Sequence, residues 1–140
     1  MRKANLLFVE DDEDDVFMLK HVCKRIGIEG TNFAANGRQA IEYLTAWFRQ
    51  AGDEYPIIFL DINMPEMNGF EFLRWLRGEA ALPAIPVIIL STSESPQDMI
   101  TAYKLGANAY LVKASALEEL ATMLGAAHNF WSRFNRLPPG

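Results

Sequence analysis

Short runs of consecutive apolar residues recur along the chain, and longer segments of helical periodicity separate them. The runs are Leu6–Val9, Ile57–Leu60, Val87–Leu90 and Ala109–Val112. Each run is apolar throughout and does not alternate with polar residues, which is typical of strands buried on both faces in a parallel sheet. Gly30–Ala34 is a weaker fifth candidate that suits a more exposed edge strand.

The segments between these runs have recognisable helix ends. Helices are predicted at residues 14–26, 38–50, 67–77, 96–105 and 115 to about 134. Ser95 and Pro96 form an N-cap followed by proline at the first helical position, and Ser115–Glu118 has the pattern of a capping box. A strand–helix order that repeats in this way predicts an α/β fold, in which right-handed crossovers join parallel strands into a doubly wound sheet with three layers.

The size, charge and cysteine content of the chain narrow the class of protein. Its 140 residues suit one domain, and its net charge of −5 argues against a nucleic-acid-binding protein, which usually presents a basic face. Cys23 is the single cysteine, so an intramolecular disulfide is impossible and a reducing compartment is expected. The sequence shows neither an apolar run of the ~20 residues that a membrane span needs nor a signal-peptide pattern. We therefore expect a soluble, cytoplasmic protein.

Polar side chains of distinct chemistry directly follow four of the predicted strands. They are Glu10 and Asp11 after the first strand, Asp61 after the third, Ser91 after the fourth and Lys113 after the fifth. In doubly wound sheets, ligands bind beyond the carboxyl ends of the strands. Acids, a hydroxyl and an amine are therefore expected to meet at one edge of the sheet.

The acids among these residues predict a divalent cation. Neighbouring carboxylates repel one another, and oxygen ligands without His or Cys suit Mg²⁺. A simpler interpretation is an acidic helix start stabilised by the helix dipole, and it accounts for residues 12–15 as capping and solvated side chains. It does not account for Glu10 and Asp11, which lie at a strand end beside a second strand that ends in Asp61.

Asp61 has the chemistry of a phosphoryl acceptor. A carboxylate is ionised at neutral pH and attacks a phosphoryl group without a general base. Phosphoryl transfer then needs in-line positioning and neutralisation of charge. The contacts that position the phosphoryl group and neutralise its charge would come from a cation at Glu10 and Asp11, from the Lys113 ammonium and from the Ser91 hydroxyl.

The ordered set of motifs resembles that of two-component response-regulator receiver domains. The matching segments are Val9–Asp11, Asp61–Pro65, Gly69, Ser91 and Gly106–Lys113, within a resemblance that spans residues 4–128. The resemblance implies a flavodoxin-like (βα)5 fold with strand order 2-1-3-4-5. It also implies an aspartyl phosphate at Asp61, formed from the phosphohistidine of a histidine kinase. The implied Mg²⁺ ligands are Glu10, Asp11, Asp61 and the backbone carbonyl of Asn63.

The same resemblance assigns further roles at this edge. Ser91 and Tyr110 would form a coupled switch, in which the hydroxyl swings toward the phosphoryl group and the aromatic ring turns inward. Asn63 and Ser93 occupy positions where the family tunes the lifetime of the phosphoryl group. One departure is Ala114, because receivers usually have proline after the lysine, often with a cis bond. A cis bond without proline costs about 3–4 kcal/mol, so this loop must hold that strain or take a trans path.

Within that family, the chain is similar to single-domain regulators that pair with phytochrome-type kinases. The segments Ala51–Pro56 and Asn129–Pro139 carry this similarity. We therefore expect a single receiver domain over residues 1–140, with an extended C-terminal helix and tail over about 115–140 and no output domain. The protein would be a phosphoacceptor that signals through phosphorylation-dependent contacts. It would not be an enzyme, because it assists only its own phosphorylation and dephosphorylation.

Aromatic residues near the C-terminus predict an interaction surface. Phe130, Trp131 and Phe134 lie where the last predicted helix extends past the sheet, so they would meet water unless they are covered. They would either fold back onto the core or form the interface of a homodimer or another partner.

Three other kinds of protein share part of this pattern. A haloacid-dehalogenase-type phosphatase also uses a strand-end Asp with Mg²⁺, but it needs a second acid two residues later, where this chain has Asn63. A flavodoxin-like electron carrier needs a phosphate loop after the first strand, where acids would repel the phosphate of FMN. A degenerate receiver acting as a constitutive scaffold is the third alternative, and the intact set of Asp61, Ser91 and Lys113 argues against it.

Overall fold

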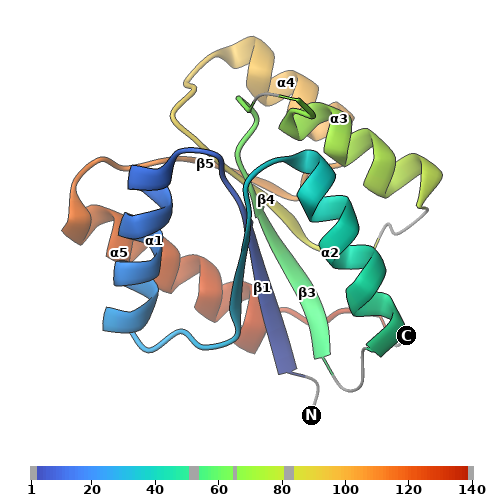
Figure 1. Ribbon diagram of the computed structural model, residues 1–140. Helices are drawn as coiled ribbons and strands as arrows, with labels where there is room; N and C mark the ends of the chain where they lie inside the picture. The colour runs from blue at the N-terminus through green and yellow to red at the C-terminus, as the bar shows by residue number, and fades with distance from the viewer. Residues whose placement is uncertain (1–2, 51–53, 65, 81–83, 139–140) are drawn as a thin grey trace.

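A parallel sheet of five strands forms the centre of the molecule (Figure 1). The computed structural model describes residues 3–50, 54–64, 66–80 and 84–138. The strands are β1 (Lys3–Val9), β2 (Thr31–Ala34), β3 (Glu54–Leu60), β4 (Val87–Ser91) and β5 (Ala109–Val112), in the order β2-β1-β3-β4-β5. The predicted flavodoxin-like fold is therefore confirmed, and the weak strand candidate is the edge strand β2.

A helix follows each strand, as predicted. The helices are α1 (Glu13–Arg25), α2 (Gly37–Gln50), α3 (Gly69–Arg74), α4 (Pro96–Lys104) and α5 (Leu117–Asn129). Two of them continue as π-helical turns, α3 into η1 (Trp75–Glu79) and α5 into η2 (Phe130–Phe134). No helix in the described part of the chain is long and apolar enough to cross a lipid bilayer.

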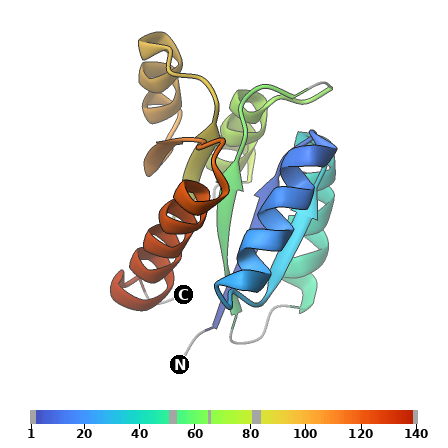
Figure 2. The same ribbon diagram turned by 90° about the vertical axis from the view of Figure 1, so that its left-hand side faces the viewer.

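Alternate residues of the central strands face opposite helical layers. In β1, Leu7 and Val9 join a core with α2, α3 and α4, whereas Leu6 and Phe8 join a core with α1 and α5. Figure 2 shows α1 and α5 together on one face of the sheet. All four side chains are buried, which explains why the second half of the strand, Leu6–Val9, is apolar throughout.

Short polar side chains begin two of the helices where the sequence predicts them. The Asp12 carboxylate accepts hydrogen bonds from the backbone N–H groups of Asp14 (2.9 Å) and Asp15 (3.1 Å) at the start of α1. The Ser95 hydroxyl accepts one from the N–H of Asp98 (3.3 Å) at the start of α4. These bonds satisfy N–H groups that have no partner within the helix.

The predicted capping box at Ser115–Glu118 is wrong. Helix α5 begins one residue later, with Ala116 at the N-cap and no side-chain hydrogen bond there. Glu118 is therefore too early in the helix to complete the box. Its carboxylate instead forms an ion pair with Arg25 of α1 at 2.7 Å, which joins the two helices of one layer.

Candidate functional site

Strand pairing brings the predicted acids together. Val9 of β1 pairs with Leu60 of β3, so Glu10 and Asp61 follow neighbouring strands at the same level. The Asp61 N–H continues the ladder by donating to the Val9 carbonyl at 3.0 Å. This edge is the carboxyl end of the sheet, where the chain turns from β1 into α1 (Figure 1).

The same backbone register positions the hydroxyl and the amine. Ser91 ends β4 and pairs with Val112 of β5. The N–H of the next residue, Lys113, donates to the Ser91 carbonyl at 2.7 Å. The described residues contain no cis peptide bond, so the peptide bond between Lys113 and Ala114 is trans.

Three carboxylates form a compact cluster at this edge. Oxygen atoms of Glu10, Asp11 and Asp61 lie within 4.8 Å of one another. Glu10 and Asp61 are only 4% and 8% exposed, whereas Asp11 faces solvent. Oxygen donors with one side open to water suit Mg²⁺, which retains several waters and takes few carboxylates. The residues present therefore fit the predicted cation.

Burial raises the pKa of both enclosed acids. The pKa of Glu10 rises to about 7 because of burial and the nearby charge of Asp61, although Lys113 opposes the shift. Burial likewise raises the pKa of Asp61, and Lys113 again lowers it. A bound cation would favour the charged form of each carboxylate and so offset this cost of burial.

The Lys113 ammonium lies among the acids without contacting Asp61. Its Nζ forms ion pairs with Glu10 and with Asp15, the latter at 3.1 Å, and the described side chains include no such pair with Asp61. Burial lowers the pKa of Lys113, but the surrounding carboxylates outweigh burial and the net shift is upward. The prediction that residues 12–15 serve only in capping and solvation is therefore wrong for Asp15.

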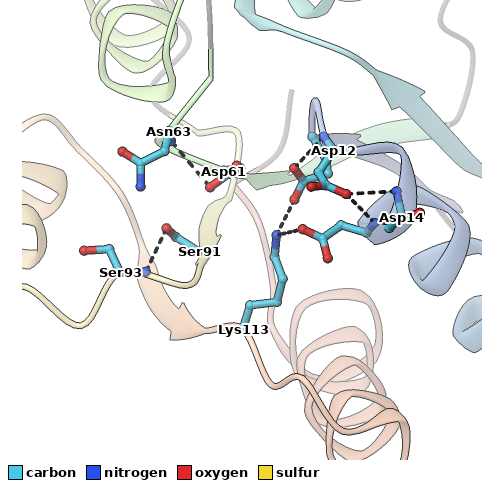
Figure 3. Close-up of polar contacts among 9 residues, drawn as sticks. Asp12, Asp14, Asp61, Asn63, Ser91, Ser93 and Lys113 are labelled. Atoms are coloured by element: carbon cyan, nitrogen blue, oxygen red, sulfur yellow. Dashed lines mark hydrogen bonds and ion pairs between the residues drawn. The ribbon is translucent and has the colours of Figure 1, made fainter.

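Ser93 links the two residues of the predicted switch. Ser91 is fully buried, and its hydroxyl oxygen accepts a hydrogen bond from the Ser93 N–H at 3.2 Å. The Ser93 carbonyl accepts a hydrogen bond from the hydroxyl of the half-buried Tyr110 at 3.0 Å. In Figure 3, Ser91 lies on the same side of Lys113 as Asp61 and Asn63. The switch itself stays a prediction.

The chain after Asp61 folds closely over the strand end. The Asn63 N–H points to the Asp61 carboxylate at 3.5 Å, and the Gly69 N–H donates to the Ile62 carbonyl at 3.3 Å. A Cβ atom at residue 69 would lie 2.4 Å from the Asp61 carbonyl oxygen. Gly69 is therefore required for this close backbone approach.

The aromatic residues near the C-terminus are divided between core and surface. Trp131 packs partly buried against the core that α1 and α5 share, whereas Phe130 and Phe134 are 51% and 68% exposed. The Tyr55 hydroxyl, at the start of β3, donates to the Ser132 carbonyl at 3.4 Å. The segment therefore lies at the end of the sheet opposite the acids. An interface formed by the phenylalanines stays a prediction.

A family comparison agrees with this geometry. The model of the response regulator receiver domain matches residues 6–125. The chain belongs to this family. The receiver domain is 31% identical over 135 residues to the response regulator Rcp1 of Synechocystis sp., a match that covers 95% of this chain and 92% of Rcp1. Receivers are signalling proteins and not classical enzymes.

Solved structures of other response regulators resemble the receiver domain along nearly its whole length. The phosphorylated cyanobacterial phytochrome response regulator RcpA matches with a TM-score of 0.84 and 27% identity, covering 99% of this chain and 100% of RcpA. RPA3017, a response regulator in red light signalling of R. palustris, matches with a TM-score of 0.83 and 33% identity, covering 97% of this chain and 99% of RPA3017. The Mn²⁺-bound form of Rcp1 matches with a TM-score of 0.75 and 30% identity, covering 98% of this chain and 99% of Rcp1. The relatives of this receiver therefore include phytochrome response regulators.

Proposed function

We propose that this receiver domain accepts a phosphoryl group on Asp61 from the phosphohistidine of a histidine kinase. The observation that carries the proposal is the convergence of Asp61 with acids, a hydroxyl and an amine from the ends of β1, β4 and β5. Membership of the receiver family supports the same function. The single-domain organisation over residues 1–140 stays a prediction.

The proposed transfer forms one bond and breaks one. An oxygen of the Asp61 carboxylate attacks phosphorus in line with the P–N bond of the phosphohistidine. The P–O bond forms as the P–N bond breaks, and the imidazole nitrogen keeps the electron pair and takes a proton from solvent. Hydrolysis of the acyl phosphate later regenerates the carboxylate and releases inorganic phosphate.

Groups of this chain would hold the transferred phosphoryl group. Glu10, Asp11 and Asp61, with the Asn63 carbonyl, would hold Mg²⁺, which supplies charge neutralisation when bound. The Ser91 hydroxyl and the Lys113 ammonium would each contact a phosphoryl oxygen. In this structure the Ser91 hydroxyl oxygen accepts a hydrogen bond from the Ser93 N–H, and the Lys113 ammonium pairs with Glu10 and Asp15. The existence of a Mn²⁺-bound form of Rcp1 supports a divalent-cation site.

Phosphorylation would be transmitted through the region around Ser93. Movement of the Ser91 hydroxyl toward the phosphoryl group would break its hydrogen bond with the Ser93 N–H, and Ser93 also holds Tyr110. An inward turn of the Tyr110 ring would then change the surface beside β5. The side chains of Asn63 and Ser93 would influence how long the phosphoryl group survives.

The proposed partners are a histidine kinase, a second copy of this chain and proteins that bind the phosphorylated form. Similarity to RcpA and RPA3017 favours a phytochrome-type kinase. The exposed rings of Phe130 and Phe134 favour a homodimer, because burial of both rings between copies would remove apolar surface from water. The single cysteine suits a cytoplasmic protein, and the net charge of −5 argues against nucleic-acid binding.

Mass spectrometry tests the phosphorylation directly. Acetyl phosphate with Mg²⁺ should add one phosphoryl group to the wild-type protein, and Asp61→Asn should abolish the addition because the nucleophilic oxygen is lost. Asp14→Asn, which removes an exposed carboxylate from the first turn of α1, is the matched control and should still be labelled. Labelling of Asp61→Asn at another residue would refute the assignment.

A further inference from the structure

Asp15 is a charged residue at the site that the proposed phosphorylation does not use. It lies in the first turn of α1, whose N-terminus is capped by Asp12. The Asp15 carboxylate is therefore not needed for capping, and its Oδ2 lies 3.1 Å from Lys113 Nζ. The Lys113 side chain is 6% exposed and that of Asp15 is 35% exposed, so the pair lies at the rim of the site.

The contact with Asp15 draws the ammonium toward α1. In Figure 3, the dashed lines from Lys113 run toward the side where Asp12 and Asp14 lie, whereas Asp61 lies on the other side. Glu10 is the second partner of Lys113, and it belongs to the cluster of carboxylates that fits a cation. Asp15 lies outside that cluster. If Glu10 held a cation instead, Asp15 would be the remaining carboxylate partner of Lys113.

We propose that Asp15 is a positioning residue that holds Lys113 away from Asp61 and so restrains capture of the phosphoryl group. The inference rests on the proposed function of Asp61. Glu10 and Asp15 both hold Nζ on the α1 side of the site, so the ammonium would have to shift toward Asp61 to donate to a phosphoryl oxygen there. Loss of the Asp15 carboxylate should therefore release Lys113 and strengthen binding at Asp61.

Solvent exposure sets the size of the expected effect. Water and salt screen an ion pair at the surface, so Asp15→Asn should tighten binding of a phosphoryl analogue by about two- to fivefold. The gain should shrink as ionic strength rises. Loss of any acid near the site also reduces repulsion toward an anion, so a charge-matched control is needed. Asp14 provides it, because it shares the first turn of α1, is exposed and has no ion pair with Lys113.

The main experiment measures the Kd of beryllofluoride in saturating Mg²⁺ by titration calorimetry. Asp15→Asn should bind more tightly than Asp14→Asn, and it should also be phosphorylated faster by acetyl phosphate. Asp15→Glu keeps a carboxylate and should stay near the wild-type affinity. Equal affinities for Asp15→Asn and Asp14→Asn would overturn the proposal, because the loss of one negative charge would then explain the whole effect. Weaker binding by Asp15→Asn would overturn it by showing that Asp15 supports Lys113.

A second measurement examines the contact in the metal-free protein. The side-chain ¹⁵N signal of Lys113 should shift in Asp15→Asn and stay in place in Asp14→Asn. An unmoved signal in Asp15→Asn would overturn the proposal, because the contact would then be absent in solution. Phosphorylation of Asp61→Asn would refute the proposed function and this inference together. If phosphorylation required Asp61 but Asp15→Asn and Asp14→Asn behaved alike, only the inference about Asp15 would be refuted.

Discussion

At the carboxyl edge of the sheet, backbone hydrogen bonds between strands place polar side chains, whereas at the opposite end the last helical turns place aromatic ones. Asp61 and Lys113 are each anchored by an N–H that extends a strand ladder, at 3.0 Å and 2.7 Å. Phe130 and Phe134 lie on the π-helical turn η2 and remain largely exposed. Polar side chains anchored by strand ladders and largely exposed aromatic rings therefore lie at opposite ends of one sheet.

The largest expected difference between the two ends of the sheet is that Mg²⁺ affinity at the cluster of acids should depend on pH. Because burial raises the pKa of Glu10 to about 7, a proton on this carboxylate should compete with Mg²⁺ at and below neutral pH. Affinity for Mg²⁺ should therefore fall as the pH drops below that value, by up to about tenfold per pH unit for one proton. Calorimetric titration at several pH values gives the slope.

Glu10→Gln supplies the control for this dependence. The variant has no carboxylate at residue 10, so its affinity should be weaker overall and should change less over the same pH range. An affinity of the wild-type protein that stays constant from neutral to mildly acidic pH would contradict the assignment of the shift to Glu10.

The next effect concerns backbone packing at the site. Gly69→Ala would place a Cβ atom 2.4 Å from the Asp61 carbonyl oxygen, so the chain must move apart there. We expect the free energy of unfolding to fall by about 1–3 kcal/mol, as in other overpacked positions, and Mg²⁺ affinity to fall with it. Urea denaturation and calorimetry measure the two quantities.

Gly78 in η1 is the matched glycine for this experiment. Apart from the adjoining backbone of the helix, no atom lies within 4 Å of a Cβ built there, so Gly78→Ala should leave Mg²⁺ binding unchanged. Loss of Mg²⁺ affinity in both alanine variants would show that the close approach at Gly69 is not the cause.

A smaller loss of stability should distinguish substitution of Trp131 from substitution of its aromatic neighbours. Trp131 packs against the core, so Trp131→Ala should lower the free energy of unfolding by about 1–2 kcal/mol, less than for a fully buried ring. Urea denaturation checks the value. A stability equal to that of the wild-type protein would show that the ring does not pack on the core in solution.

The smallest effect on stability is expected for Phe134, which is 68% exposed. Phe134→Ala should change the free energy of unfolding by no more than about 0.5 kcal/mol, as is usual for surface substitutions. The same substitution should weaken self-association in sedimentation experiments if the proposed homodimer uses this ring. An unchanged monomer–dimer balance in the double variant Phe130→Ala/Phe134→Ala would reject that interface.

The strands and the main site residues could be predicted from the sequence for a simple geometric reason. Consecutive apolar residues identify strands buried on both faces, and the carboxyl ends of parallel strands meet at one edge. These two rules place Asp61 and Glu10 at the same edge without any knowledge of side-chain packing, and the strand order implied by the family resemblance makes their strands neighbours. Gly69 belongs to the recognised motif, although the reason for a glycine there appears only in the distance to the Asp61 carbonyl.

Contacts that depend on how a helix is tilted and where it starts could not be predicted in this way. The ion pair between Asp15 and Lys113 requires the first turn of α1 to face the end of β5, and no periodicity encodes that orientation. The N-cap of α5 lies one residue after Ser115, because Ser115–Glu118 has the composition of a capping box without its geometry. The π-helical turn η2 similarly decides that Trp131 faces the core while Phe134 does not.

The hydrogen bonds of Ser93 have a consequence for how sharply the protein can respond. Its N–H is bound to the Ser91 hydroxyl and its carbonyl to the Tyr110 hydroxyl, so both residues of the proposed switch hold one short piece of backbone. If either residue moves alone, a polar group of Ser93 loses its partner. Because the N–H and the carbonyl belong to one residue, a shift of the Ser93 backbone that breaks one bond also disturbs the other, and this couples the two residues of the proposed switch.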